Sequence, residues 1–226
     1  MKKLISILIC CSIYSKALAQ EVYKEYGIAL ILPPEYSIEA QKMNKEIAAQ
    51  VPTATNMPNV FHVTLFQGCF AETKIGKLYL ELKNQNFKKI KIRLAPEIKT
   101  AEDHYINWSV HKSKELQNLH KAAVKIANPY HQGILARYLD SINELNKKQR
   151  SQVVIYGMSG LLDEYNPHVT LFYFAKKSSE IKNIAKKISP PKLTKGSPAP
   201  EAYSIAIAEL GYNGNIEKVL YSIELK

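Results

Sequence analysis

The chain is poor in residues that cross-link a protein or anchor it in a membrane. Its 226 residues include only three cysteines, and no apolar run approaches the roughly 20 residues that a membrane-spanning helix needs. Cys10 and Cys11 lie in a leader segment that we expect to be removed, which leaves Cys69 alone. A single thiol cannot form an internal disulfide framework. We therefore expect Cys69 to be a buried apolar residue and the mature protein to have no stable membrane insertion.

Metal-binding patterns are missing too. The sequence has no H-E-x-x-H motif and, outside the leader, no pair of cysteines. These are the spacings typical of zinc sites. We therefore expect a function that uses no metal ion and no other cofactor.

The first 19 residues have the three parts of a secretory signal peptide. Two lysines precede an apolar run over residues 4–14, and residues 17–19 supply Ala-Leu-Ala for cleavage. The pattern predicts a signal peptide at 1–19, export to the periplasm or out of the cell, and a single mature domain over residues 20–226. Lipidation at Cys10 or Cys11 is an alternative, but it would leave a very short apolar region before the cleavage point.

Basic residues outnumber acidic ones by 31 to 20, which gives a formal net charge of +11. Removal of the leader takes away three lysines and no acid, so the mature charge is 11 − 3 = +8. Such a surplus attracts anions, including nucleotides and RNA. It can equally serve solubility, so charge supports a polyanionic substrate only weakly.

The composition, 46% hydrophobic and 23% charged, is that of a globular protein. Apolar or alternating segments predict strands, which we expect at residues 26–32, 61–66, 88–94, 105–111, 168–172, 202–210 and 218–225. Apolar residues at helical spacing predict helices at 37–51, 71–82, 114–128, 132–148 and 178–188. Residues 189–200 form a Pro-rich loop, and 211–214 form a hairpin turn. The pattern favours an α+β fold with two similar lobes.

The string His-Val-Thr-Leu-Phe occurs twice, at residues 62–66 and 168–172. An unplanned match of five residues is expected on the order of once in a hundred chains of this size. On a strand, alternate side chains share a face, so we expect His62, Thr64 and Phe66 on one side and the intervening residues on the other. The same holds for the second copy. If the lobes are related by a pseudo-twofold, the two polar faces meet in one cleft.

Two imidazoles and two hydroxyls in one cleft suit cleavage of a phosphodiester. One histidine can take a proton from the attacking oxygen while the other gives a proton to the leaving oxygen. The threonines can donate hydrogen bonds to non-bridging phosphate oxygens as charge shifts in the transition state. We therefore predict four catalytic residues, which are His62, Thr64, His168 and Thr170.

These paired H-x-T-hydrophobic elements resemble those of the two-histidine (2H) phosphoesterases, which include bacterial RNA 2′-5′ ligase and 2′,3′-cyclic phosphodiesterase proteins. The resemblance spans nearly all of the mature chain, through both motifs, the strand and helix over 105–126, and the closing hairpin. It implies a bilobal fold with sheets facing a central cleft and helices outside. It also implies that the four residues above are a catalytic tetrad that opens a 2′,3′-cyclic phosphate or cleaves a nucleotide phosphodiester. Where an Arg often follows the second motif in that family, this chain has Phe172-Tyr173-Phe174.

Three phenylalanines near the motifs, Phe66, Phe172 and Phe174, are candidates for binding substrate by stacking on a nucleobase. Rings at such positions are more often part of the core.

Other polar residues have simpler explanations. A lysine-rich strand face at Lys89, Lys91 and Arg93 could guide phosphates, but we expect a solvated sheet edge that discourages aggregation. The unpaired histidines are expected to be surface or structural residues, and these are His104, His111, His120 and His131.

Three functions fit these patterns. The expected one is an exported, metal-independent phosphodiesterase that acts on a nucleotide or on the end of an RNA. The second is a pocket that binds a nucleotide or phosphate ester without turnover. The third is a basic exported protein that binds RNA or envelope polyanions, with the motifs merely structural. We expect a monomer that does not bind duplex DNA.

Overall fold

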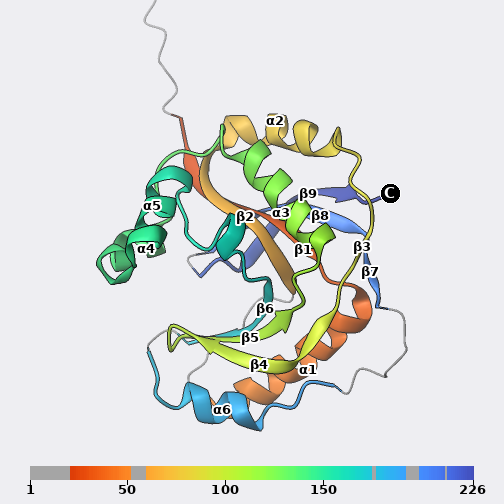
Figure 1. The fold of residues 1–226 in the computed structure, drawn as a ribbon, viewed down its shortest axis with the longest axis vertical. Helices are drawn as coiled ribbons and strands as arrows, with labels where there is room; N and C mark the ends of the chain where they lie inside the picture. Colours follow the sequence, from red (N-terminus) through yellow and green to blue (C-terminus); the bar gives the residue numbers. More distant parts are fainter. Residues whose placement is uncertain (1–20, 52–59, 175–176, 192–198, 212) are drawn as a thin grey trace, which may run out of the picture.

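The computed structural model describes residues 21–51, 60–174, 177–191, 199–211 and 213–226 (Figure 1). The predicted signal peptide, most of the predicted loop at 189–200 and Tyr212 in the predicted turn lie outside the described residues. Among the described residues, no helix is both long enough and apolar enough to cross a bilayer.

The strands form two main antiparallel sheets, one in each lobe. The first has the order β2-β1-β8-β9 and the second the order β4-β5-β6, while β3 and β7 form a short separate pair. Their bounds are Tyr23–Ile31 (β1), His62–Ala71 (β2), Ile90–Lys91 (β3), Leu94–Ala101 (β4), Tyr105–Val110 (β5), His168–Tyr173 (β6), Glu201–Ala202 (β7), Ser204–Leu210 (β8) and Ile216–Glu224 (β9). Each copy of the repeat begins an edge strand, β2 or β6, and these two strands contact each other.

The helices lie outside the sheets (Figure 1). Their bounds are Pro34–Ala48 (α1), Glu72–Lys83 (α2), Lys114–Ala127 (α3), Ala136–Ser141 (α4), Lys147–Tyr156 (α5) and Ile181–Lys187 (α6), with 3-10 turns at Ile142–Glu144 (η1) and Leu162–Glu164 (η2). Two helices cross between the lobes. Helix α1 follows β1 but packs on β6, and α3 follows β5 but packs on β2. Each motif strand is therefore covered by a helix that follows a strand of the other sheet.

Two predictions of local structure are wrong. The single helix expected over 132–148 is divided into α4, η1 and α5, because Asn146 starts a new helix through a reciprocal capping box with Gln149. The strand expected over 88–94 shrinks to the two residues of β3, and the longer β4 begins only at Leu94. The alternation over 88–94 correctly indicated that Ile90, Ile92 and Leu94 are buried, but the helical spacing over 132–148 did not indicate burial, because Leu139 is 57% exposed. Neither pattern indicated where the helices and strands end.

Both motif strands contain an irregularity at the same position in the repeat. The register of β2 against β1 shifts by one residue between Thr64 and Phe66, and the register of β6 against β5 shifts in the same way after Thr170. Leu65 and Leu171 are thus the extra residues of two matching β-bulges. A bulge removes a residue from the ladder of strand hydrogen bonds, so its carbonyl needs another donor.

The crossing helices supply those donors. The Leu65 carbonyl accepts a hydrogen bond from Nδ1 of His120 on α3 (2.8 Å). The Leu171 carbonyl accepts one from the Asn44 side-chain amide on α1 (2.6 Å). Both donors are buried. The same constraint is met in the two lobes by different side chains from equivalent helices.

We expect Asn44→Ala to lower the free energy of unfolding by about 1–3 kcal/mol, because it leaves the buried Leu171 carbonyl unpaired. Urea denaturation of the mature protein measures this change. Lys45→Ala, on the exposed face of the same helix, should change stability by less than about 0.5 kcal/mol. Equal effects of the two substitutions would contradict the capping role of Asn44.

Candidate active site

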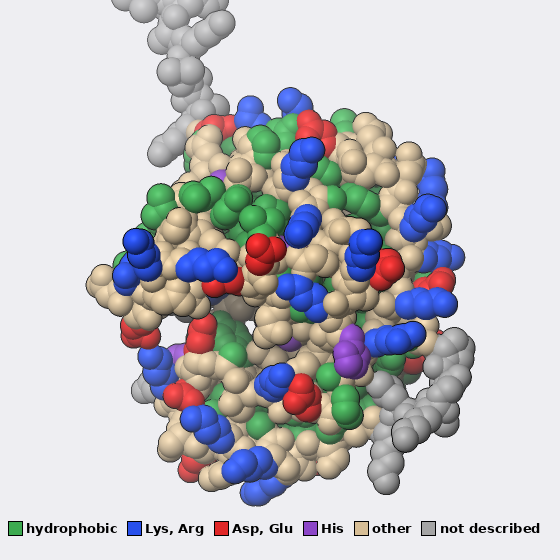
Figure 2. Space-filling view, in the orientation of Figure 1, with side chains coloured by type: hydrophobic (Ala, Val, Ile, Leu, Met, Phe, Trp, Pro, Cys, Tyr) green, Lys and Arg blue, Asp and Glu red, His purple; other side chains and the backbone are tan. Residues whose placement is uncertain are grey.

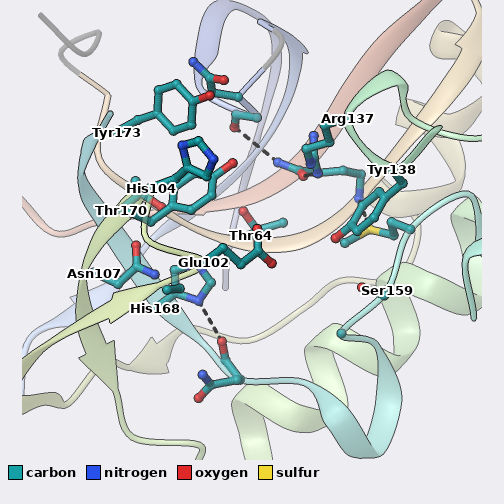
Figure 3. Close-up of a pocket in the computed structure, with 18 of the residues that line it drawn as sticks. Thr64, Glu102, His104, Asn107, Arg137, Tyr138, Ser159, His168, Thr170 and Tyr173 are labelled. Atoms are coloured by element: carbon teal, nitrogen blue, oxygen red, sulfur yellow. Dashed lines mark hydrogen bonds between the residues drawn. The ribbon is translucent and has the colours of Figure 1, made fainter. Parts of the chain in front are cut away.

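A cleft of about 720 Å³ separates the two lobes. It is lined by the motif strands, the β4–β5 turn, α4 with η1, the segment before β6 and the β8–β9 turn. Figure 2 shows the hollow between the lobes at the left of the view, and Figure 3 shows its interior. The four residues predicted as catalytic all line this cleft: His62, Thr64, His168 and Thr170.

The two histidines are held in the same way. Nδ1 of His62 bonds to the Val60 carbonyl (3.1 Å), and Nδ1 of His168 bonds to the Asn166 carbonyl (2.8 Å). A carbonyl can only accept, so each Nδ1 carries the hydrogen. Each Nε2 is then left for the cleft, as a base when the ring is neutral and as an acid when it is protonated. Because each histidine bonds to the carbonyl of the residue two positions earlier, the two Nε2 atoms occupy equivalent places on the two sides of one site.

Burial in the cleft lowers the pKa of both histidines below 6.5. The charge of His168 lowers the pKa of His62 further, so the state in which both rings are protonated is disfavoured. A pair coupled in this way takes up its protons in two steps. Over the interval between these steps, one ring is protonated and the other is neutral.

The predicted stacking role of Phe66, Phe172 and Phe174 does not agree with their positions. Phe66 and Phe172 are fully buried, Phe174 is 7% exposed, and none of the three lines the cleft. The bulges explain the outcome, because the extra residue reverses the alternation after each threonine and turns the next ring into the core. The residues that follow, Gln67 and Tyr173, take the cleft positions instead.

Tyrosines supply the aromatic surface of the cleft, and the sequence interpretation did not identify them. Tyr173 stacks against His104 at 5.7 Å with an interplanar angle of 11°. Nδ1 of His104 bonds to the Phe174 carbonyl (2.9 Å), so this histidine lines the cleft and is not a simple surface residue. Tyr105 lies against Tyr173 at 5.0 Å. Together these rings form a surface on which a planar base could lie.

His120 is structural, as expected, and it supports the motif of the other lobe. It is fully buried, its Nδ1–H donates to the Leu65 carbonyl, and its Nε2 accepts from the Leu162 amide (2.8 Å). The ring stacks on Tyr165 with a centroid distance of 3.7 Å. The Tyr165 hydroxyl in turn donates to the Thr64 carbonyl (3.0 Å). These contacts require a neutral imidazole, and burial lowers the pKa of His120 to about 4.

One end of the cleft is held by a polar network around Gln67. Arg137 on α4 donates to the Gln67 side-chain oxygen, and the Gln67 amide donates to the Gly214 carbonyl (3.2 Å). Arg137 also lies 3.9 Å from the Glu25 carboxylate. No repeat includes Arg137, so nothing in the motif pattern indicated it.

The positive charge of the chain does not gather in the cleft. Besides the histidines, its charged lining is Arg137 and Lys177 against Glu102, Asp103, Asp140, Glu144 and Glu164. Lys177 lies 3.1 Å from Glu144. Figure 2 shows lysines and arginines scattered over the outer surface instead. Among the described residues, no group of three or more His, Cys, Asp and Glu side chains is arranged to hold a metal.

Lys89, Lys91 and Arg93 lie away from the cleft. They are exposed around the short β3–β7 pair and line a separate hollow with His111 and Lys112. Lys91 is opposite Glu201 on β7. This placement agrees with the expected solvated edge.

No protein-family model matches the chain, and no curated protein matches it in sequence. Solved structures do match. Apo LigT of E. coli superposes with a TM-score of 0.53 at 13% identity, over 91% of this chain and 99% of LigT. TT0787 of Thermus thermophilus superposes with a TM-score of 0.51 at 16% identity, over 89% of this chain and 97% of that protein. LigT has also been solved with 3′-AMP, with a TM-score of 0.51 at 15% identity, over 90% of this chain and 98% of LigT.

The chain has the two-histidine phosphoesterase fold. The bilobal α+β architecture expected from the sequence is confirmed over nearly the whole described chain. At identities of 13 to 16% the likeness is one of fold. In this version of the 2H fold, the motif histidines and threonines of both lobes meet in the central cleft.

We expect the stability of the protein to fall as pH drops from about 6.5 toward 4, in part through His120. The pKa of His120 is lower in the folded chain, so the unfolded chain binds more protons over this interval and stability rises with pH. The contribution of His120 is about 3 kcal/mol, at 1.36 kcal/mol per pKa unit.

Urea denaturation of wild type and His120→Gln at several pH values measures this contribution. His62 and His168 contribute in the same direction in both proteins, so only the difference between the proteins reports on His120. That difference should shrink as pH falls. A difference that stays constant from pH 7.5 to pH 4 would show that His120 is not held neutral.

Proposed function

We propose that the mature protein hydrolyses a 2′,3′-cyclic phosphate, or a related phosphodiester of a nucleotide or RNA end, by paired-histidine acid and base catalysis without a metal. The observation that carries this proposal is the matched support of His62 and His168, which leaves two Nε2 atoms for one cleft. The fold is shared with LigT, a protein that has been solved with 3′-AMP.

The steps follow from the two protonation states of the pair. One neutral histidine takes a proton from water through Nε2 as the water oxygen attacks phosphorus. The bond from phosphorus to the 2′ or 3′ oxygen breaks, and the other histidine gives its Nε2 proton to that oxygen. The products are a phosphate monoester and a hydroxyl. A proton exchange with solvent then returns the pair to its starting state.

Thr64 and Thr170 are suited to the charge that develops on the phosphate. Each follows its histidine by two residues on the same face, before the bulge, and each lines the cleft. A hydroxyl donor fixed by a strand stabilises a developing oxyanion without reorganisation. The mixed charge of the lining also favours a substrate with one phosphodiester group in the cleft over a polyphosphate.

We further propose that the protein works outside the cytoplasm. Support comes from the order of basic, apolar and small residues over positions 1–19. In that setting, degradation of extracellular nucleotides or RNA suits the proposed chemistry better than a ligation that consumes ATP. We propose that the exported protein is a monomer.

Expression of the full chain with its leader tests the export proposal. We expect the protein to be recovered from the periplasm or the medium with Gln20 at its N-terminus. N-terminal sequencing measures this directly. Recovery in the cytoplasm with the leader intact would contradict it, and a lipid-modified cysteine would support the alternative.

Incubation of residues 20–226 with 2′,3′-cyclic nucleotides and with short RNAs that end in a cyclic phosphate, in the presence of EDTA, tests the activity. Wild type should release phosphate monoesters, and His62→Ala or His168→Ala should each lower kcat by about 10²–10⁴-fold. His111→Ala, at an exposed histidine outside the cleft, is the matched control and should be fully active. A requirement for added metal, or activity in both cleft variants, would contradict the mechanism.

The same assay, followed against pH, has a distinctive expected shape. One histidine must be neutral and the other protonated, so kcat/KM should follow a bell. Because burial lowers both pKa values in the free protein from 6.5, the maximum should lie on the acidic side of 6.5. Calorimetry that shows a bound but unchanged nucleotide would instead favour the binding-protein alternative.

A further inference from the structure

Asn107 lies in the cleft, and no described residue bonds to its side-chain oxygen. The residue is 7% exposed and lines the cleft, and its Oδ1 is unpaired among the described residues. Figure 3 shows its amide beside His168 and Thr170. An unpaired buried polar atom is costly, and in native proteins such an atom is often reserved for a ligand or water.

Asn107 makes the two halves of the site unequal. It stands on β5 directly opposite Thr170. The matching position on β1, opposite Thr64, is Ala29. Ala29 belongs to a small apolar cluster with Ala208, Leu210 and Ile216. The halves therefore share histidine and threonine but differ in the group beside the threonine, so a substrate would bind better in one orientation than in the other.

The chemistry of an amide limits what Asn107 can bind. Directly opposite residues in an antiparallel pair have Cβ atoms about 4.5–5.5 Å apart, so the amide reaches atoms next to those that Thr170 contacts. Non-bridging phosphate oxygens only accept hydrogen bonds and cannot satisfy Oδ1. A hydroxyl both donates and accepts, which matches the oxygen and the NH₂ of an amide. Hydrolysis of a phosphodiester releases such a hydroxyl beside the phosphate.

We infer that Asn107 binds the ribose hydroxyl that hydrolysis releases, an inference that rests on the proposed function. Its Oδ1 accepts the new O–H as the bond to phosphorus breaks, so the contact strengthens as the reaction proceeds. The ribose then lies on the β5–β6 half of the cleft, and water attacks from the β2 half. In this orientation His168 is the general acid and His62 the general base.

The charges around the two histidines agree with this orientation. Burial lowers both pKa values, but the Glu102 carboxylate on the β4–β5 turn raises that of His168, whereas the charge of His168 further lowers that of His62. Both charges act in the direction that the general-acid role of His168 requires. His104 and the cleft tyrosines also line this space, and its remaining charged groups are Asp103, Arg137, Asp140, Glu144, Glu164 and Lys177.

Calorimetric titration of the mature protein tests the contact with matched nucleotides. Adenosine 3′-phosphate is compared with its 2′-deoxy analogue, and adenosine 2′-phosphate with its 3′-deoxy analogue; uridine nucleotides repeat the series. In one of these pairs, wild type should bind the hydroxyl-bearing nucleotide about tenfold more tightly. Asn107→Ala should reduce the ratio to about one, and Ser109→Ala on the same strand should leave it unchanged.

Asn107→Asp separates recognition from folding. It keeps the acceptor and adds a charge that repels phosphate, so both nucleotides should weaken while the ratio persists. A wild-type ratio of one in both pairs, with adenosine and with uridine nucleotides alike, or a tenfold ratio that survives in Asn107→Ala, would overturn the inference even if cyclic phosphates are hydrolysed. A ratio that Asn107→Ala abolishes, in a protein without turnover, would support the hydroxyl contact and remove only the proposed catalysis.

Discussion

The site depends on hydrogen bonds from two buried side chains to two backbone carbonyls. Leu65 and Leu171 are bulged out of their ladders, and their carbonyls are held by His120 and Asn44 from helices that cross between the lobes. Each bulge comes directly after the threonine of its motif, so it leaves histidine and threonine facing the cleft while the next ring enters the core. The same two hydrogen bonds join each motif strand to its crossing helix. Cleft geometry and core packing therefore depend on the same contacts.

The support of the histidines is symmetric, but their surroundings are not. Both rings are bound through Nδ1 to a carbonyl two residues earlier, which makes them interchangeable as bases or acids. Asn107 is paired with the strand of His168, and the Glu102 carboxylate raises the pKa of His168 but is not among the causes that shift the pKa of His62. A pseudo-symmetric fold can thus provide two equivalent proton carriers. A few residues that have no counterpart in the other lobe can then give one histidine the role of acid and the other the role of base.

The sequence was most informative where a short repeat carried rare residues. His62, Thr64, His168 and Thr170 follow from strand alternation, and all four line the cleft. The same alternation failed at Phe66 and Phe172, because a bulge depends on pairing with β1 or β5 and leaves no mark on the strand's own residues. Gln67 and Tyr173 stand at equivalent places one residue beyond the repeated string. Asn107 and Arg137 come from other elements, so only the tertiary fold could place them.

The structure of the mature protein with a nucleoside 2′- or 3′-phosphate bound tests the central claim most directly. We expect phosphorus between Nε2 of His62 and Nε2 of His168, with the hydroxyls of Thr64 and Thr170 donating to the non-bridging oxygens. A phosphate held instead in the basic hollow beside the β3–β7 pair, with no ligand between the two histidines, would contradict it.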